Sequence, residues 1–424
     1  MTAPTPPLRW LPTSGLPRSF KSRIAERVAR SRDPIARLRA GRRLELYYEV
    51  GDPHSQLAAA LARRIHARLP TGLDLRLVPT PDAHTYPEEA KQRDFAARDA
   101  ARLAPCHDLP APVPVPPAQR AAMQARLAQA PDAATFLAVE RDCLDALRDG
   151  RPLAPPSGED RTAQVLQANA ERRRRLGHYL PAMWQYRGEW FWALDRLDFL
   201  HARLQADGAL HGDDPLSPLD ARRLVTDDRD PSAPLECWFS FRSPYSYLAV
   251  VELLRQREAG RHPTLQPRPV LPMIMRGLPV PAVKRLYIVR DVHRCAAAQG
   301  IPFGRIHDPV GDGVLRVLTV YPYDADPDTQ LRFAALAMQS IWAEGLDLCR
   351  DANLASVFAR CGLDWAAAQR TLAQGIDTAR AEANREALFA AGLWGVPSFR
   401  QNGFTTWGQD RIWMLDRPAA SSAP

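Results

Sequence analysis

Ser243 and Pro244 lie where two sequence patterns meet. The run before them, Leu235–Phe241, is dense in aromatic residues and predicts a strand, and the apolar spacing after them, from Leu248 to Leu254, predicts a helix. Proline is favoured at the first helical position, so Ser243 is expected at the N-cap, beside the free amides of the first turn. Those amides and the helix dipole attract an anion, although a lone Ser-Pro is most often only a cap.

A second stretch, Gly395–Arg411, stands near the C-terminal end of the sequence. Asn402-Gly403 between two short apolar runs predicts a hairpin, and Gln409 onward predicts a closing helix.

Three short stretches together resemble the motifs of the 2-hydroxychromene-2-carboxylate isomerases and kappa-class glutathione transferases. They are Ser243-Pro244-Tyr245-Ser246, Val396-Pro397 and Trp407-Gly408-Gln409-Asp410-Arg411. These families belong to the DsbA-like branch of the thioredoxin fold. The resemblance runs from about Leu235 to Asp416. It implies a first strand, the Ser-Pro turn, a helical insertion, and a cis Val-Pro bond before the hairpin.

The resemblance also implies a role for each matching residue. Ser243 would orient the sulfur of glutathione, the backbone of Val396 beside a cis Pro397 would pair with its cysteinyl moiety, and Lys284 would bind its glycyl carboxylate. Asp410, with Gln409, would bind the γ-glutamyl amine.

Tyr245, Tyr247 and Trp407 are further candidates, because aromatic residues near the turn would shape an apolar substrate pocket. Such residues are more often simply core. The family usually has a longer, Asn-containing loop before the lysine, whereas this chain has only Met275–Lys284. Another thiol, or none, therefore stays open as the ligand.

The reaction that the resemblance implies is isomerisation or conjugation of a conjugated aromatic small molecule by a thiolate. The alternative is a non-catalytic binding or assembly protein on a thioredoxin-like scaffold. A dithiol oxidoreductase is disfavoured, because none of the six cysteines forms a Cys-x-x-Cys pair. Their isolated spacing also predicts neither a zinc site nor a disulfide framework, which fits a reducing compartment.

An internal repeat indicates two copies of one fold. Tyr48–Ala58 aligns without gaps on Phe239–Ala249, and Leu180–Arg196 resembles the stretch around Val396-Pro397, with one residue of hairpin length different. Asp52 takes the place of Ser243, and its carboxylate would repel an anionic sulfur, so the first copy is expected to be degenerate.

The predicted fold is α/β, with two tandem thioredoxin-like domains that each carry a helical insertion and form an intramolecular pseudo-dimer. The expected parts are a basic arm (1–41), the degenerate domain (42–205), a linker (206–234), the isomerase or transferase domain (235–417) and a tail (418–424). Strands are predicted at 44–50, 73–78, 235–241 and 264–271, and helices at 53–69, 117–147, 161–176, 281–292, 331–342, 351–360, 364–372 and 376–391. The prolines of 264–271 favour an edge position.

Charge is concentrated in the arm. Between Pro17 and Arg43 there are nine Arg, one Lys and two acidic residues, whereas the whole chain of 424 residues has a net charge of +8. A nucleic-acid enzyme usually spreads its basic surface over the folded domain, so that class is disfavoured. The arm is expected either to pack on the body, to contact a partner or anionic surface, or to be disordered. No apolar run reaches the ~20 residues of a membrane span, which predicts a cytoplasmic protein.

Overall fold

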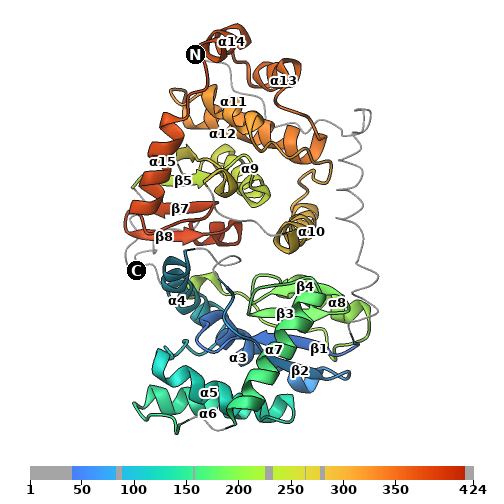
Figure 1. The fold of residues 1–424 in the computed structure, drawn as a ribbon. Coiled ribbons are helices and arrows are strands. Elements are labelled where there is room, and N and C mark those ends of the chain that lie inside the picture. Colours follow the sequence, from blue (N-terminus) through green and yellow to red (C-terminus); the bar gives the residue numbers. More distant parts are fainter. Residues whose placement is uncertain are drawn as a thin grey trace, which may run out of the picture. The chain divides into compact units, whose positions relative to one another are not determined.

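The structure, a computed structural model, describes residues 41–82, 88–155, 158–224, 233–262, 264–276 and 282–415. The chain divides between residues 225 and 226 into two compact units (Figure 1). We call the described residues 41–224 the first unit and 233–415 the second unit. Residues 1–40 of the basic arm, the tail and the loop 277–281 lie outside the described residues.

The second unit is built on a four-stranded sheet with the order β6-β5-β7-β8. Its elements are β5 (Leu235–Phe239), α9 (Pro244–Glu258), β6 (Gln266–Pro269), α10 (Ala282–Ala298), α11 (Asp312–Thr319), α12 (Pro327–Gln339), α13 (Asp351–Cys361), α14 (Trp365–Ala373), α15 (Ala379–Ala390), β7 (Ser398–Gln401) and β8 (Phe404–Trp407). A π-helical turn (Ser340–Glu344) extends α12, and a 3-10 helix (Gln409–Leu415) follows β8.

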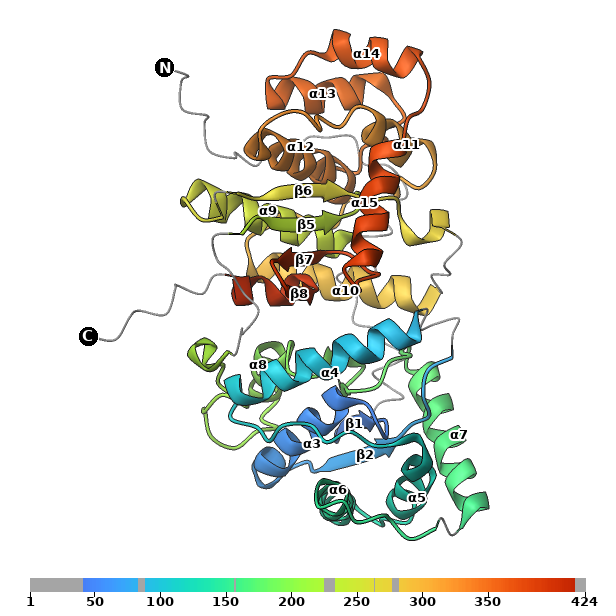
Figure 2. The ribbon, with the colours of Figure 1, turned by 90° about the vertical axis from the view of Figure 1, so that its left-hand side faces the viewer.

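Strand directions place Ser243, which follows β5, at the same end of the sheet as Val396 and Pro397, which precede β7. β5 runs parallel to β6 and antiparallel to β7, with Trp238 opposite both Arg268 and Ser398. Helix α9 lies on one face of the sheet and α15 on the other (Figures 1 and 2). All five residues of β5 are buried, as the aromatic-rich sequence requires of a central strand.

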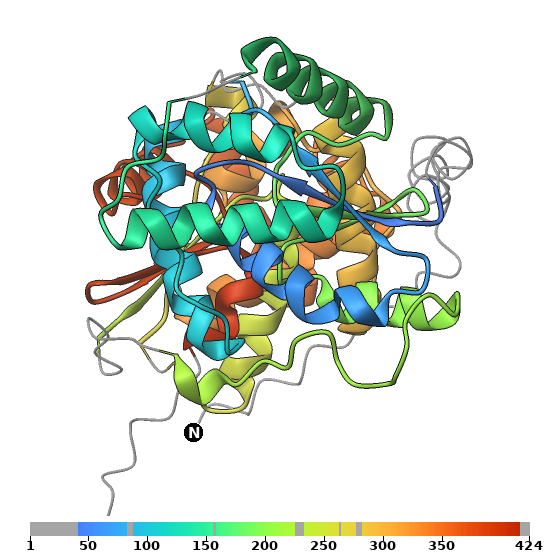
Figure 3. The same cartoon turned by 90° about the horizontal axis from the view of Figure 1, so that it is seen from below.

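The first unit has a sheet of the same kind, with the order β2-β1-β3-β4. Its elements are β1 (Leu44–Tyr48), α3 (Pro53–Ile65), β2 (Leu73–Leu77), α4 (Glu89–Cys106), α5 (Pro117–Ala128), α6 (Ala133–Arg148), α7 (Glu159–Arg175), β3 (Met183–Tyr186), β4 (Glu189–Trp192) and α8 (Leu197–Ala206). β1 is parallel to β2 and antiparallel to β3. In Figure 3 the teal helices α5 and α6 lie nearest the viewer.

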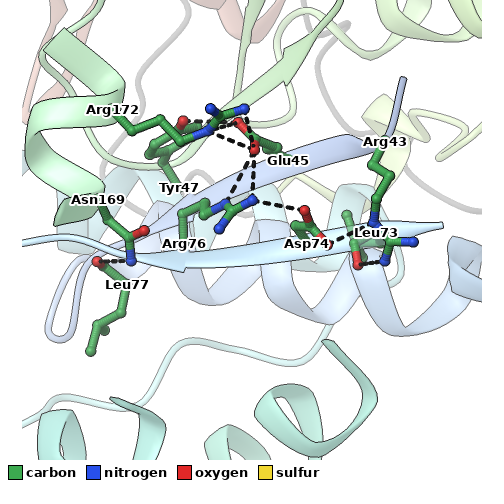
Figure 4. A network of polar contacts seen from close by, with 9 residues as sticks. All are labelled: Arg43, Glu45, Tyr47, Leu73, Asp74, Arg76, Leu77, Asn169 and Arg172. Carbon is green, nitrogen blue, oxygen red and sulfur yellow. Dashed lines mark hydrogen bonds and ion pairs between the residues drawn. The ribbon is translucent and has the colours of Figure 1, made fainter. Parts of the chain in front are cut away.

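A buried carboxylate ties this sheet to α7 (Figure 4). Glu45 on β1 is 3% exposed and accepts hydrogen bonds from Arg76 of β2, Arg172 of α7 and the hydroxyl of Tyr47. Two guanidinium groups compensate the desolvation of one carboxylate, so the network holds strand and helix together.

The two hairpins correct one detail of the predicted repeat. β3–β4 and β7–β8 both have two residues between their strands, and Met183 pairs with Trp192 as Ser398 pairs with Trp407. The extra residue therefore lies before β3 and not in the hairpin. The residue that corresponds to Pro397 is Ala182, not Pro181.

The expected linker begins as part of the first unit. His211 donates its amide to the carbonyl of Arg68, Asp220 donates to Cys106, and His107 hydrogen-bonds the Ser217 hydroxyl at 3.1 Å. These contacts anchor the chain to the first unit as far as Asp220. Among the helices of the described ranges, none has the length and apolarity needed to cross a membrane.

Candidate functional site

The start of α9 forms as the Ser-Pro pattern predicts. Ser243 is the N-cap in an extended conformation, Pro244 occupies the first turn, and the Ser243 hydroxyl oxygen accepts the amide of Ser246 at 3.2 Å. Ser246 is fully buried and its hydroxyl accepts the amide of Ser240 at 3.3 Å. The turn between β5 and α9 is thus fixed by two side-chain oxygens, and Ser243 is left half-buried at its tip.

Val396 and Pro397 lie directly against this tip. Their peptide bond is cis, as the resemblance implied, and it is the only cis bond within the described ranges. Since β7 begins at Ser398 and pairs with β5, the residues just before it lie beside the end of β5. The Ser243 hydroxyl donates to the carbonyl of Val396 across 3.4 Å, which is long for an O–H···O hydrogen bond.

Gln409 and Asp410 follow β8 and are tied to the same segment. Gly408 donates its amide to the carbonyl of Pro397 at 2.9 Å, which fixes the start of the closing 3-10 helix. The Gln409 amide nitrogen donates to the Asp410 carboxylate, and Gln299 at the end of α10 donates to the Gln409 carbonyl oxygen at 3.2 Å. The structure therefore places Ser243 beside Val396, and it places Gln409 and Asp410 directly after Gly408, which bonds to Pro397.

Lys284 comes from a separate element, the first turn of α10, which packs against α9. Its side chain is half-buried, and burial lowers the pKa of its ammonium group. A desolvated ammonium gains more from an anionic partner than an exposed one does.

Two of the three aromatic candidates, Tyr245 and Trp407, are half-buried, as a pocket wall requires. The Tyr245 hydroxyl donates to Asp291 Oδ2 at 2.7 Å, and the Trp407 ring packs on that of Trp394 with centroids 4.9 Å apart. Tyr247, which the sequence places near the turn, is instead a fully buried core residue whose hydroxyl donates to the Pro302 carbonyl.

Sequence reasoning missed two partners of this turn. Asp291 receives the Tyr245 hydroxyl and pairs with Arg294. Arg242, next to Ser243, makes a two-pronged contact with Asp308, with both N···O distances at 2.8 Å. Only the repeat carried a signal for Asp291, because Arg290-Asp291 and Arg294 are matched by Arg98-Asp99 and Arg102.

A separate concavity of about 380 Å³ lies at the outer edge of β6, away from Ser243. It is lined by residues from around β6, α12 and α15: Leu265, Gln266, Pro267, Arg268, Tyr323, Ala325, Pro327, Gln330, Arg380, Ala383 and Asn384. None of them is a predicted site residue. The described ranges also contain no cluster of His, Cys, Asp and Glu that would hold a metal ion.

Comparison with known proteins adds a family assignment for one part of the chain. Residues 234–418 match the family model of the DSBA-like thioredoxin domain. A solved 2-hydroxychromene-2-carboxylate isomerase is 26% identical, with a TM-score of 0.36 and coverage of 43% of this chain and 92% of its own. The cytosolic disulfide reductase DsbM from Pseudomonas aeruginosa is 18% identical, with a TM-score of 0.30 and coverage of 43% and 95%. No curated protein matches the chain. Residues 234–418 are therefore a DSBA-like thioredoxin domain.

Proposed function

We propose that the second unit is a glutathione-dependent isomerase or transferase acting on a conjugated aromatic small molecule, and that the first unit is structural. The observation that carries this proposal is the Ser243 hydroxyl at the N-terminus of α9, next to the Val396–Pro397 peptide. This position supplies both a hydrogen-bond donor and a favourable potential for a thiolate.

The hydroxyl proton of Ser243 is available to a ligand. Its present acceptor, the Val396 carbonyl, lies at 3.4 Å, so a thiolate placed beside the hydroxyl would compete for the proton and form a stronger, charge-assisted bond. A free thiol has a pKa of about 8.5. A helix N-terminus contributes up to ~2 kcal/mol, or about 1.5 pKa units, and so brings the thiol pKa close to neutrality.

The remaining predicted site residues have charges that suit glutathione. Asp410 would hold the amine of the γ-glutamyl residue, with Gln409 fixing its carboxylate, and Lys284 would hold the glycyl carboxylate. Only three of the 56 Lys and Arg residues in the chain are lysines, and one of them is Lys284.

The reaction would proceed by addition and elimination. The sulfur lone pair forms a C–S bond to the conjugated substrate, and the displaced π electrons move to the substrate carbonyl. Rotation about the bond that has become single changes the geometry. Return of the electrons then expels the thiolate, so isomerisation regenerates glutathione unchanged. In a transferase reaction the C–S bond is kept and a proton is added to the product.

Three matching contacts support two copies of one fold. In the first unit Ser55 accepts the amide of Glu49, as Ser246 accepts that of Ser240. Two further ties recur: His54 with Asp99 corresponds to Tyr245 with Asp291, and Asn169 donating to the Leu77 carbonyl corresponds to Asn384 donating to the Pro269 carbonyl.

Three replacements support a degenerate first unit. Asp52 stands for Ser243, and its carboxylate already accepts both the amide and the hydroxyl of Ser55. Ala182 stands for Pro397. Matching Asp99 with Asp291 places Gln92 where the second unit has Lys284. We infer that the first unit cannot hold the same ligand. The pseudo-dimer and the cytoplasmic location stay predictions.

A binding or assembly protein is the second candidate. The observation in its favour is that the Ser243 hydroxyl already has an acceptor within the protein, the Val396 carbonyl. A scaffold that only binds partners would need no thiol there.

Calorimetric titration with glutathione, followed by Ser243→Ala, separates the two candidates. Loss of a hydrogen bond to a charged sulfur should weaken binding about tenfold or more. Asp52→Ala is the matched control, because it also removes an N-cap but lies in the first unit, and it should leave affinity unchanged. Absence of glutathione binding by the unmodified chain, or an affinity that Ser243→Ala does not alter, would contradict the enzyme proposal.

A further inference from the structure

The first turn of α9 is fastened to α10 through a buried carboxylate. Asp291, 1% exposed, accepts the Tyr245 hydroxyl at 2.7 Å through one oxygen and pairs with Arg294 through the other. Tyr245 is two residues after Ser243. A hydroxyl whose proton points at Asp291 is not free to donate that proton to a sulfur or a substrate.

An equivalent side-chain contact exists in the first unit, with histidine in place of tyrosine. His54, two residues after Asp52, contacts Asp99 of α4 at 2.9 Å between Nε2 and Oδ2, and Asp99 is also 1% exposed. The contact is present although Ser243, Pro397 and Lys284 are all replaced there. This contact is therefore a feature of how α10 packs on α9 and how α4 packs on α3, and it does not depend on a bound thiol.

Helix geometry connects this tie to Lys284. Lys284 and Asp291 are seven residues apart, which is about two turns, so both side chains leave α10 on the same face. Because Asp291 is held against Tyr245, this face is turned toward α9. A rotation of α10 about its axis would break the Tyr245 hydrogen bond and swing Lys284 away together.

We propose that Asp291 is a positioning residue for the thiol site: by holding the Tyr245 hydroxyl it fixes the rotation of α10 and so keeps Lys284 on the side of α10 that faces α9. This inference rests on the proposed function for its consequence in glutathione binding. Its structural part, the control of Lys284 by Asp291, is testable without any ligand.

The first test follows Lys284 directly. Reductive methylation of the full chain with ¹³C-formaldehyde labels only Lys21, Lys91, Lys284 and the N-terminus, and Lys284→Arg assigns the signal of interest. Asp291→Ala should move the Lys284 resonance and change its titration, with the Lys91 resonance unmoved. Tyr245→Phe, which removes only the hydroxyl, is the milder variant if Asp291→Ala does not fold, and Asp291→Asn should restore most of the original signal. Asp99→Ala, the matched control, should leave the Lys284 signal in place. A Lys284 resonance unchanged in both Asp291→Ala and Tyr245→Phe overturns the inference.

The second test asks whether Asp291 acts through Lys284. Lys284→Ala and Asp291→Ala should each weaken glutathione binding about five- to tenfold, and the double variant should bind no more weakly than Lys284→Ala alone. Losses that multiply in the double variant would mean that Asp291 does not act through Lys284, and would overturn the inference. If the unmodified chain binds no glutathione, the proposed function fails, whereas the Lys284 resonance still decides the role of Asp291.

Discussion

At the residue scale, positions 52 and 243 show how one structural role accepts two chemistries. Asp52 and Ser243 each cap a helix that begins with proline, and each oxygen accepts the amide three residues later. A carboxylate satisfies this role at least as well as a hydroxyl does. Only the hydroxyl also offers a proton, so the difference matters for a thiolate ligand and not for the fold.

A buried acid next to Asp52 predicts a pH dependence of stability. Glu49 is 2% exposed, and burial, with the nearby Asp52 carboxylate, raises its pKa from 4.5 to about 7. Because the folded pKa is raised, the unfolded chain releases this proton first, and the contribution of Glu49 falls as pH rises from about 4.5 to 7. The expected cost above pH 7 is on the order of 3 kcal/mol.

Glu49→Gln should therefore raise the unfolding free energy at pH 8 and change it little at pH 5. Denaturant titrations of the unmodified chain and of Glu49→Gln at pH 5 and pH 8 measure the difference in unfolding free energy between them. The contributions of the other titrating groups cancel in this difference. The prediction is wrong if the two proteins show the same pH dependence.

A glycine beside the site predicts a local packing defect. A Cβ on Gly395 would lie 2.7 Å from Nε1 of the Trp407 indole, and a rigid ring cannot give way as a flexible chain end does. Gly395→Ala should cost about 1–3 kcal/mol of unfolding free energy. Gly313→Ala in α11 is the control, because its Cβ would meet nothing closer than 3.5 Å and alanine favours the helix. Thermal unfolding of both variants checks this, and equal effects would contradict it.

Individual site residues were only partly readable from the sequence. The cap at Ser243 follows from local rules, since Ser before Pro at the start of an apolar helical pattern satisfies the free amides. Asp291 did not stand out, because a single Asp among Arg residues on a helix is an ordinary surface pattern. Its burial comes from packing against α9, which local sequence does not encode.

At the element scale, the outer edge of each sheet is closed by an asparagine from the helix before the hairpin. Asn384 of α15 donates to the Pro269 carbonyl of β6 at 3.0 Å, and Asn169 of α7 donates to the Leu77 carbonyl of β2 at 2.9 Å. The prolines in β6 predicted an edge strand, and the strand order confirms this. Proline is tolerated there because an edge strand has no outer partner that needs its N–H.

The two asparagines should differ in their contribution to stability. Asn384 is 9% exposed and its side chain also accepts from Arg268, whereas Asn169 is half-buried. Asn384→Ala should cost about 1–3 kcal/mol, because the Pro269 carbonyl is then left buried without a donor. Asn169→Ala should cost less, since water can replace the amide there. Denaturant unfolding of the pair measures this, and a larger cost at Asn169 would refute the burial argument.

The sequence predicted most element types but not their boundaries, and it predicted no helix at α4, α8 or α11. The stretch 117–147 was expected to be helical and contains two helices, α5 and α6, separated at residues 129–132. Asp132 ends the connection by accepting the amide of Thr135 as an N-cap. Hydrophobic periodicity runs through such a break when both helices bury the same kind of residue, so only the cap marks it.

At the scale of the whole molecule, the chain forms two compact units, and the sheets of both have the same kind of strand order. The repeat placed the strands correctly but misplaced one residue, because Pro181 and Pro397 are the more obvious match in the sequence. Strand pairing decides the alignment, and it places Ala182 at the position of Pro397. Long-range pairing is the information that a single sequence lacks.

This alignment predicts that the first unit cannot be converted to a thiol site by one substitution. Asp52→Ser restores the hydroxyl but leaves Ala182 and Gln92 in place of Pro397 and Lys284. Calorimetric titration of the unmodified chain and of Asp52→Ser should therefore give the same stoichiometry, one glutathione per chain. Loss of the Asp52 bonds to Ser55 should cost at most about 2 kcal/mol, so the variant should fold. A stoichiometry of two for Asp52→Ser would mean that the hydroxyl at the helix start suffices for binding, and that Pro397 and Lys284 are dispensable to the site.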